Sequence, residues 1–464
     1  MVKVLSQYVP GRLFVLLVTE NILIILGVWV ALSLDTGRFQ LALLSYPALL
    51  TKALLITVIC QLCFYLNDLY DLKSIGSPLE MALRLLKTLG MASLLLAFLY
   101  LVIPQARLGS GIVEISVVAI ALIILLWRVL VEWFHGAYGA RERILIVGSG
   151  ADAQALAREV RGRQDLRIEM VGLVSDNGGS PEGAFCGAPC LGGLETFNAI
   201  VRQTRPRRVV VAMEERRDHL PMDALLNLRL RGVPVEYANT FYEKLAGRIP
   251  VESIHPSDLV FSDIFYGPHR PLTYRRILGA AGSLLGMVLF GPLMALIAVA
   301  IKLDSPGPVL YRQDRVGLDG HVFEILKFRS MRADAESETG PVWAERSDAR
   351  TTRVGGLLRK LRLDELPQLV NILRGEMNFI GPRPERPCFV EMLHPQIPFY
   401  DVRHVIRPGV TGWAQVSYEY SSCLEEAKEK FEYDLFYLKN MSLSLDLLIL
   451  FQTFKIAILG RGAR

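Results

Sequence analysis

Residues 357–385 have the sequence LLRKLRLDELPQLVNILRGEMNFIGPRPE, which sets two adjacent carboxylates, Asp364 and Glu365, just ahead of a proline and an apolar helical run. Paired acids are suited to hold a metal ion, and cations around them are suited to hold phosphate. The pattern therefore predicts phosphoryl chemistry. Basic side chains flank the pair on both sides, at Arg359, Lys360, Arg362, Arg374 and Arg383.

The same two acids also fit a common helix-capping device. An Asp at the N-cap, followed by Glu and Pro in the first turn, stabilises many helices. A capped helix without chemistry is therefore the alternative explanation for Asp364 and Glu365. The two roles are compatible, because a helix N-terminus favours a bound phosphate.

The composition indicates a membrane protein. The chain has 464 residues, of which 52% are hydrophobic, and its mean hydropathy is +0.33, above that of an average soluble protein. The net charge of +5 fits contact with anionic lipids or phosphorylated substrates better than nucleic-acid binding. Cys60 and Cys63 lie in an apolar run without a second pair or nearby His, so zinc is not expected. All six cysteines are predicted to be reduced.

Four apolar segments in the first third of the chain are each about long enough to cross a bilayer as a helix. Basic residues gather before the first segment, between the second and third, and after the fourth. Arg38 and Arg107 are the only basic residues in the other two loops. This asymmetry predicts a four-helix transmembrane bundle with both ends in the cytoplasm. The segments are 13–34, 46–66, 82–103 and 112–134.

Short apolar strands and helices alternate after the bundle, which predicts a Rossmann-like parallel sheet. The turn from Gly148 to Ala153 has the spacing G-x-G-x-x-A of a dinucleotide-binding fingerprint. Asp176 lies farther along than the usual ribose-binding acid. A Rossmann-like domain that keeps this turn without binding a dinucleotide is therefore an alternative of equal weight. The expected strands are 143–147, 168–174, 208–213 and 233–237, and the expected helices are 154–161, 194–203 and 222–231.

A fifth apolar run covers residues 277–301 and contains Gly291 and Pro292. A simple span would place everything after it outside the cell. Pro292 removes a helical hydrogen bond and kinks a helix, and the later chain is rich in Lys and Arg. We therefore predict a re-entrant helix over about 275–302 that returns to the cytoplasmic face.

Three further segments have simpler interpretations. Strand periodicity puts Lys327 and Arg329 on one face, either as a cationic ledge for phosphate or as a solvated strand face. Residues 340–355 are expected to form a loop, which closes over a ligand or is simply solvated. Residues 442–459 are expected to form an interfacial or packing helix.

Six ordered motifs after residue 300 resemble those of the bacterial polyprenyl-phosphate hexose-1-phosphate transferases. These are large monotopic phosphoglycosyl transferases that start exopolysaccharide and O-antigen assembly. The resemblance covers essentially all of residues 270–464. It departs at Arg362, where many members carry a small hydroxyl residue, and at Gly291, where some members have Ser. The motifs are IKLDSPGPV (301–309), KFRSM (327–331), LDELPQL (363–369), IGPRPE (380–385), RPGVTGWAQ (407–415) and YDL (433–435).

The resemblance implies a two-step phosphoryl transfer. Asp364 is the expected nucleophile on the β-phosphate of a UDP-sugar, releasing UMP and leaving a phosphosugar on the enzyme, which passes to a polyprenyl phosphate. Glu365 is the expected second catalytic acid and the ligand of Mg²⁺. Asp434 matches a family acid and is either a second ligand or an orienting group. The expected phosphate or nucleotide cradle is Lys327, Arg329, Arg383 and Asp434.

The implied organisation has three parts in a bacterial inner membrane. These are the four-span bundle (1–138), a cytoplasmic Rossmann-like domain (139–266) and a mostly helical catalytic domain (267–464) that contains the re-entrant helix. A homodimer is compatible with the resemblance, and the sequence does not predict which sugar is transferred.

Three other function classes are the alternatives. A membrane-bound, NAD-dependent UDP-sugar dehydratase or epimerase is disfavoured, because no Tyr has a Lys four positions later. An Asp-x-Asp glycosyltransferase is disfavoured too, because that triplet does not occur. A non-catalytic scaffold that senses a nucleotide would not need the cations around Asp364.

Overall fold

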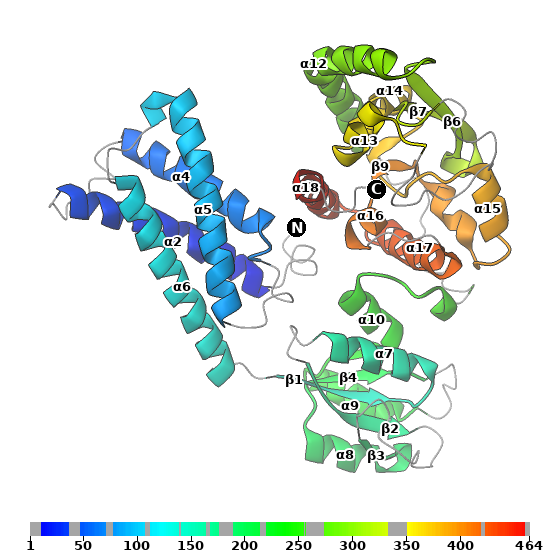
Figure 1. Ribbon diagram of the computed structural model, residues 1–464. Helices are drawn as coiled ribbons and strands as arrows, with labels where there is room; N and C mark the ends of the chain where they lie inside the picture. Colours follow the sequence, from blue (N-terminus) through cyan, green and yellow to red (C-terminus); the bar gives the residue numbers. More distant parts are fainter. Residues whose placement is uncertain are drawn as a thin grey trace. The chain divides into compact units, whose positions relative to one another are not determined.

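The computed structural model shows a mostly helical chain with one five-stranded sheet and several long apolar helices (Figure 1). It divides into two compact units, residues 1–236 and 237–464, which are described separately. The predicted three-domain boundaries stay predictions, and Asp176 and residues 340–349 lie outside the described residues. The structure describes residues 11–36, 47–70, 78–106, 112–138, 141–163, 168–175, 189–213, 220–254, 256, 273–332, 350–418 and 423–459.

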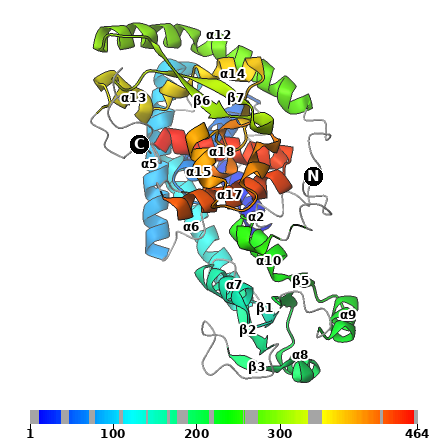
Figure 2. The same ribbon diagram turned by 90° about the vertical axis from the view of Figure 1, so that its right-hand side faces the viewer.

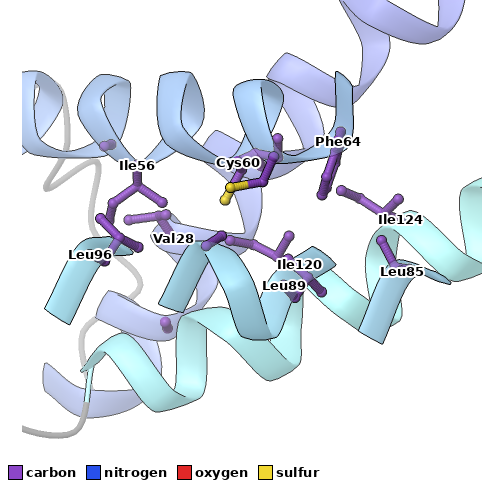
Figure 3. Close-up of a cluster of buried hydrophobic side chains, with 14 of the residues drawn as sticks. Val28, Ile56, Cys60, Phe64, Leu85, Leu89, Leu96, Ile120 and Ile124 are labelled. Atoms are coloured by element: carbon purple, nitrogen blue, oxygen red, sulfur yellow. The ribbon is translucent and has the colours of Figure 1, made fainter. Parts of the chain in front are cut away.

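The four predicted apolar segments all form long helices. Their shared core is built mainly from apolar side chains, and Figure 3 shows Val28, Cys60 and Ile120 converging from three of the helices. Large apolar side chains also cover the outer surface, as expected of helices in lipid. The helices are α2 (Gly11–Thr36), α4 (Pro47–Leu66), α5 (Pro78–Val102) and α6 (Ile112–Tyr138).

The number of membrane crossings stays a prediction. By length and composition, α2 over Val15–Leu34 and α5 over Leu79–Val102 are able to span a bilayer. The other two carry shorter apolar stretches, Leu50–Leu66 and Ile115–Val131. Helices α2 and α6 pack along each other, so the segments form one bundle.

One buried ion pair crosses this apolar bundle. Arg128 on α6 donates from Nε to Glu20 Oε1 on α2 at 2.7 Å, and both side chains are almost fully buried. Arg128 also donates to the Leu69 carbonyl at 2.8 Å, and the Tyr70 hydroxyl donates to Glu20 at 2.7 Å. The pair therefore ties α2 and α6 to the chain that leaves α4.

Removing one partner of this pair should destabilise the bundle. Arg128→Met leaves the Glu20 carboxylate buried without its cation, so we expect a loss of about 3–5 kcal/mol. The double change Glu20→Leu with Arg128→Met should recover most of it, because no buried charge remains. Thermal unfolding in detergent measures both effects.

The matched control is Arg84→Met, which breaks a half-exposed pair with Glu80 on α5. That pair should contribute less than about 1 kcal/mol. Equal melting temperatures for Arg128→Met and Arg84→Met would contradict the role given to the buried pair.

The sheet has the order β3-β2-β1-β4-β5, with β1 paired in parallel to both β2 and β4. The predicted strands are confirmed, and the sequence analysis missed the short strand β3. Helices α8 and α9 pack on one face through Phe197, Ile200 and Leu225, and Figure 1 shows α7 away from α8 across the sheet. The elements are β1 (Glu142–Val147), α7 (Ala151–Gly162), β2 (Ile168–Ser175), β3 (Cys190–Gly193), α8 (Phe197–Thr204), β4 (Arg208–Val211), α9 (Met222–Leu230) and β5 (Val235–Tyr237).

Packing alone explains the first glycine of the fingerprint. Gly148 has φ +121°, and a Cβ there would lie 2.3 Å from the Ala212 carbonyl oxygen at the end of β4. The close approach of the two strand ends therefore requires glycine whether or not a nucleotide binds. Nucleotide binding by this turn stays a prediction.

The second unit combines helices with two small strand pairs, of which Figure 2 labels β6 and β7. Strands β6 and β7 form an antiparallel hairpin, and β8 and β9 pair in parallel. The elements are α10 (Ala238–Ala246), α12 (Thr273–Asp304), β6 (Leu310–Val316), β7 (Val322–Phe328), α13 (Arg353–Lys360), α14 (Gln368–Arg374), β8 (Asn378–Ile380), α15 (Pro387–Leu393), β9 (Gly409–Thr411), α16 (Trp413–Ser417), α17 (Leu424–Lys439) and α18 (Leu443–Leu459), with short 3-10 turns at Val251–Ser253, Leu318–Gly320, Leu363–Glu365 and Tyr400–Val405.

Helix α12 corresponds to the predicted re-entrant segment. It contains Pro292, and Figures 1 and 2 show it as two segments that meet at an angle. Only 11% of its apolar stretch is buried within the protein. Two of its glycines allow close packing: a Cβ on Gly282 would lie 2.9 Å from the Phe379 ring, and one on Gly286 would lie 3.2 Å from Leu369. Re-entry into the membrane stays a prediction.

A segment missed by the sequence analysis, residues 238–254, packs on α17. The Trp413 indole donates to the Gly247 carbonyl at 2.7 Å, and Ile249 N donates to the Glu432 carbonyl at 3.1 Å. Glu243 accepts from Lys439 at 2.6 Å, and Glu432 Oε1 accepts from Val251 N at 3.1 Å. We call residues 238–254 the strap.

Glu432 should make the stability of the strap depend on pH. Burial raises the pKa of Glu432 to about 7, against the opposing effects of the Val251 hydrogen bond and Arg248. Between about pH 5 and 7 the folded state keeps a proton that the unfolded state releases, so rising pH lowers stability. Glu432→Gln should remove about 2–3 kcal/mol of this decline, measured by thermal unfolding of the full chain at several pH values.

The control is Glu429→Gln, which also removes a carboxylate from the same helix beside Arg248. Glu429 is about one-third exposed, so this variant should keep the decline. A wild-type decline that Glu432→Gln leaves unchanged would show that another group causes it.

Candidate active site

The two acids lie on a 3-10 turn, Leu363–Glu365, between α13 and α14. Arg362, where the chain departs from the motif, enters the turn with φ +54°, a left-handed conformation that is uncommon for a non-glycine residue. The N-cap position of α14 is Pro367, and no side chain caps it. The capping interpretation of Asp364 and Glu365 is therefore wrong.

Glu365 lies between two cations. Its Oε1 accepts from Arg383 Nη2 at 3.0 Å and from Lys327 Nζ at 3.3 Å, and its side chain is 12% exposed. Burial alone would raise the pKa of Glu365, but Arg383 and Lys327 outweigh it and bring the pKa to about 2. Glu365 therefore remains an anion at every physiological pH.

Asp364 has the opposite electrostatic environment. Burial raises its pKa, repulsion from Glu365 adds to the rise, and Lys327 and Arg383 offset only part of it. The two neighbouring carboxylates are thus distinct: Glu365 is a fixed charge, and Asp364 is the more basic of the two.

Asn371 positions Lys327 beside the turn. Its side chain is fully buried on α14 and donates from Nδ2 to the Glu324 carbonyl at 2.7 Å. Its Oδ1 accepts from Leu326 N at 3.0 Å. These bonds fix β7 against the helix that follows the acids, so Lys327 reaches Glu365.

Arg329 is one of two predicted cradle residues that the structure does not bring to the acids. It follows the end of β7 and is 5% exposed. Its guanidinium donates to the Pro306 carbonyl at 2.7 Å and to the carbonyl and hydroxyl of Ser305 at 2.7 and 2.8 Å. Arg329 therefore holds the backbone of the DSPGP segment, residues 304–308. Phosphate binding by Arg329 stays a prediction.

Asp434 is the second predicted cradle residue that the structure does not bring to the acids. It is 2% exposed on α17, and its Oδ2 accepts from Arg403 Nη2 at 2.9 Å. Burial raises the pKa of Asp434 to about 6, and Arg403 opposes this rise. Among the described residues it makes no contact with Asp364 or Glu365. Gly291 and Pro292 lie within α12, as predicted.

Three residues of the site were missed from sequence. Arg403 and Asn371 are internal to their helices, and Arg315 lies on β6. Only Asn371 gave a signal, since it is the one polar residue in the run Leu369–Leu373 that follows the acids.

The donor chemistry of the acids fits Mg²⁺. Glu365 Oε1 takes both cation contacts, so its Oε2 remains available within the part of the chain that the structure describes. That same part contains no group of three or more His, Cys, Asp or Glu side chains arranged to hold a metal. An ion at Glu365 would therefore need further oxygens from phosphate or water.

Comparison with known proteins matches two parts of the chain to described families. Residues 271–460 match the bacterial sugar transferase family, and residues 65–228 match a CoA-binding domain. The UDP-glucose:undecaprenyl-phosphate glucose-1-phosphate transferase of Escherichia coli (strain K12) is 30% identical over 338 residues, covering 70% of each chain. The chain belongs to the bacterial sugar transferase family.

Two other relatives show how members of the bacterial sugar transferase family differ in length. The UDP-N-acetylgalactosamine-undecaprenyl-phosphate N-acetylgalactosaminephosphotransferase of Aeromonas hydrophila is 42% identical over 240 residues, 52% of this chain and 56% of its own length. The exopolysaccharide production protein PSS of Rhizobium leguminosarum bv. phaseoli is 38% identical over 191 residues, which are 39% of this chain but 94% of its own length. The chain thus spans little more than half of the first relative and nearly all of the second.

Removing the Asn371 amide should weaken the transferase fold at the site. Asn371→Ala leaves Leu326 N and the Glu324 carbonyl without their buried partner, so we expect a loss of about 2–3 kcal/mol in unfolding free energy. Chemical denaturation of the full chain measures it. The control is Gln396→Ala, which removes an exposed amide that follows α15 and donates to the Met392 carbonyl. Equal losses in the two variants would contradict the anchoring role.

Proposed function

We propose that the protein transfers a sugar-1-phosphate from a UDP-sugar to undecaprenyl phosphate and releases UMP. Family membership and the names of the relatives support this reaction class. The observation that carries the proposal is the pairing of an ionised Glu365 with a more basic Asp364, beside Lys327 and Arg383. Neither rival enzyme class accounts for this arrangement, and a nucleotide-sensing scaffold would not need it.

In the first step, a carboxylate oxygen of Asp364 attacks the β-phosphorus of the UDP-sugar. A bond forms between that oxygen and phosphorus, and the bond from phosphorus to the bridging oxygen breaks. UMP leaves with the bridging oxygen and the electron pair of the broken bond. The product on the enzyme is an acyl phosphate that carries the sugar.

In the second step, a phosphate oxygen of undecaprenyl phosphate attacks the same phosphorus. The bond to Asp364 breaks and returns the carboxylate, so the enzyme is regenerated. The lipid leaves as a diphosphate-linked sugar. Asp364 is thus the nucleophile of the first displacement and the leaving group of the second.

Charge neutralisation is the main electrostatic requirement, because a carboxylate must approach a diphosphate. Lys327 and Arg383 supply two cations within contact distance of Glu365, and a forked guanidinium suits phosphate oxygens. Mg²⁺ held by Glu365 with phosphate oxygens would add positive charge where the leaving oxygen develops negative charge.

The proposed setting is the bacterial inner membrane, with the catalytic unit on the cytoplasmic face. The apolar helices of the first unit would form four spans. Helix α12 would enter the bilayer, bend at Pro292 and return, which keeps Asp364 within reach of a lipid phosphate. A homodimer stays a prediction.

The relatives' names narrow the choice of donor. They name N-acetylgalactosamine for one protein and glucose for another. A panel of UDP-N-acetylgalactosamine and UDP-glucose with undecaprenyl phosphate, scored by UMP release, identifies the donor of this chain.

Asp364→Asn should abolish exchange of labelled UMP into the UDP-sugar, measured with Mg²⁺ and without lipid acceptor. Exchange requires the covalent step to run forward and back, and an amide is too weak a nucleophile for it. We expect a loss of at least about a thousandfold. The control is Asp319→Asn, which changes an exposed acid on the β6–β7 turn.

Two results would contradict the covalent role. Exchange retained by Asp364→Asn would assign the nucleophile elsewhere. Wild-type protein that transfers sugar phosphate to lipid but never exchanges UMP would indicate direct transfer between the two substrates.

A further inference from the structure

Three consecutive carbonyls around Arg383 are all held by hydrogen bonds. The Arg383 carbonyl accepts from Arg403 Nη2 at 2.9 Å. The Pro384 carbonyl accepts from Arg315 Nη1 at 2.9 Å, and the Glu385 carbonyl accepts from Val316 N at 2.9 Å. The backbone that carries the Arg383 side chain is therefore fixed by two arginines and a strand.

Arg403 is itself held in place. It is 6% exposed, and its Nη2 donates to both the Arg383 carbonyl and Asp434 Oδ2, each at 2.9 Å. Its Nη1 donates to the Tyr400 hydroxyl, and Tyr400 packs against Phe431 with ring centroids 5.3 Å apart. One guanidinium thus connects α17 to the turn that bears Arg383.

Asp434 supplies the charge that this connection needs. A buried guanidinium is costly unless a carboxylate pairs with it. Arg403 has no other acidic partner at ion-pair distance among the described residues. At 2% exposure, Asp434 presents almost no surface to solvent.

We propose that Asp434 is a positioning residue that acts through Arg403 to aim Arg383 at the reacting phosphate. The inference rests on the proposed transfer reaction. Of the two roles predicted for Asp434, it selects the orienting group over the second metal ligand. Asp434 keeps Arg403 in place, Arg403 holds the Arg383 carbonyl, and the Arg383 side chain contacts Glu365.

A kinetic cycle tests the chain of contacts. Asp434→Asn keeps the shape and an acceptor oxygen but removes the charge. We expect kcat/KM to fall about ten- to a hundredfold, as for other small misplacements of a catalytic group. In an Arg383→Ala background the same change should cost less than about threefold, because the group being positioned is already gone.

Mg²⁺ dependence separates positioning from metal binding. Loss of a metal ligand raises the Mg²⁺ concentration for half-maximal rate, and excess Mg²⁺ then restores activity. Asp434→Asn should leave that concentration within about twofold of wild type, because Asp434 contacts Arg403 and supplies no oxygen to the ion. A tenfold rise, or losses that multiply in the double variant, overturns the proposal.

The matched control is Glu432→Gln, another buried acid on α17, which holds the strap and not Arg403. It should retain the wild-type kcat/KM within about threefold. An equal loss in both variants would mean that α17 is merely destabilised, and it overturns the specific role of Asp434.

A labelling experiment tests the position without any catalysis. Arg383→Cys is introduced with Cys388→Ser and Cys423→Ser, which remove the exposed cysteines of the described residues. The rate of reaction with N-ethylmaleimide at position 383 is followed by mass spectrometry. Adding Asp434→Asn should change that rate at least about threefold, because the turn is released, and adding Glu432→Gln should not.

The two arms keep the failures apart. If wild-type protein transfers no sugar phosphate, the proposed function fails, and the labelling rates still decide whether Asp434 positions residue 383. If wild-type protein transfers sugar phosphate but Asp434→Asn leaves the labelling rate unchanged, the positioning inference fails while the proposed function stands.

Discussion

The contact of one carboxylate oxygen of Glu365 with both Lys327 and Arg383 is the interaction on which the site depends. It needs two groups far apart in sequence to meet at one atom. Asn371 fixes the strand that brings Lys327, and the bonded carbonyls of 383–385 fix the turn that brings Arg383. The cost of desolvating three charges is offset only if this geometry is kept. The fold around the site therefore holds Lys327 and Arg383 against the same oxygen of Glu365.

Five arginines of the second unit donate to backbone carbonyls. Arg329 donates to the Ser305 and Pro306 carbonyls, Arg276 to the last carbonyls of α14, and Arg407 to Gly375. Arg403 and Arg315 do the same beside Arg383. A guanidinium presents several donors in a fixed plane, so it can join carbonyls that no secondary structure pairs. In a unit with short strands and many turns, these bonds connect backbone segments that no sheet joins.

The sequence was informative where chemistry is local and uninformative where it depends on packing. The adjacent Asp364 and Glu365, with Lys327 and Arg383 in neighbouring motifs, predicted four residues that the structure brings together. Alternation along a strand could not separate Lys327 from Arg329, because β7 ends before residue 329 and the chain turns inward. The pairing of Asp434 with Arg403 joins residues 31 positions apart and had no sequence signal. The capping alternative failed because Pro367, and not an acid, precedes the first turn of α14.

Long apolar faces belong to the catalytic unit as well as to the bundle. Helix α12 exposes leucines and valines along most of its length, and α18 exposes Leu447, Leu450 and Phe451 on one side. These faces lie on the same unit as the acids, after residue 236. Cutting away the first unit would consequently not yield a water-soluble enzyme: the remaining protein would still partition into detergent micelles and aggregate when they are withdrawn. The second unit, which carries Asp364 and Glu365, therefore requires detergent or lipid even without the transmembrane bundle.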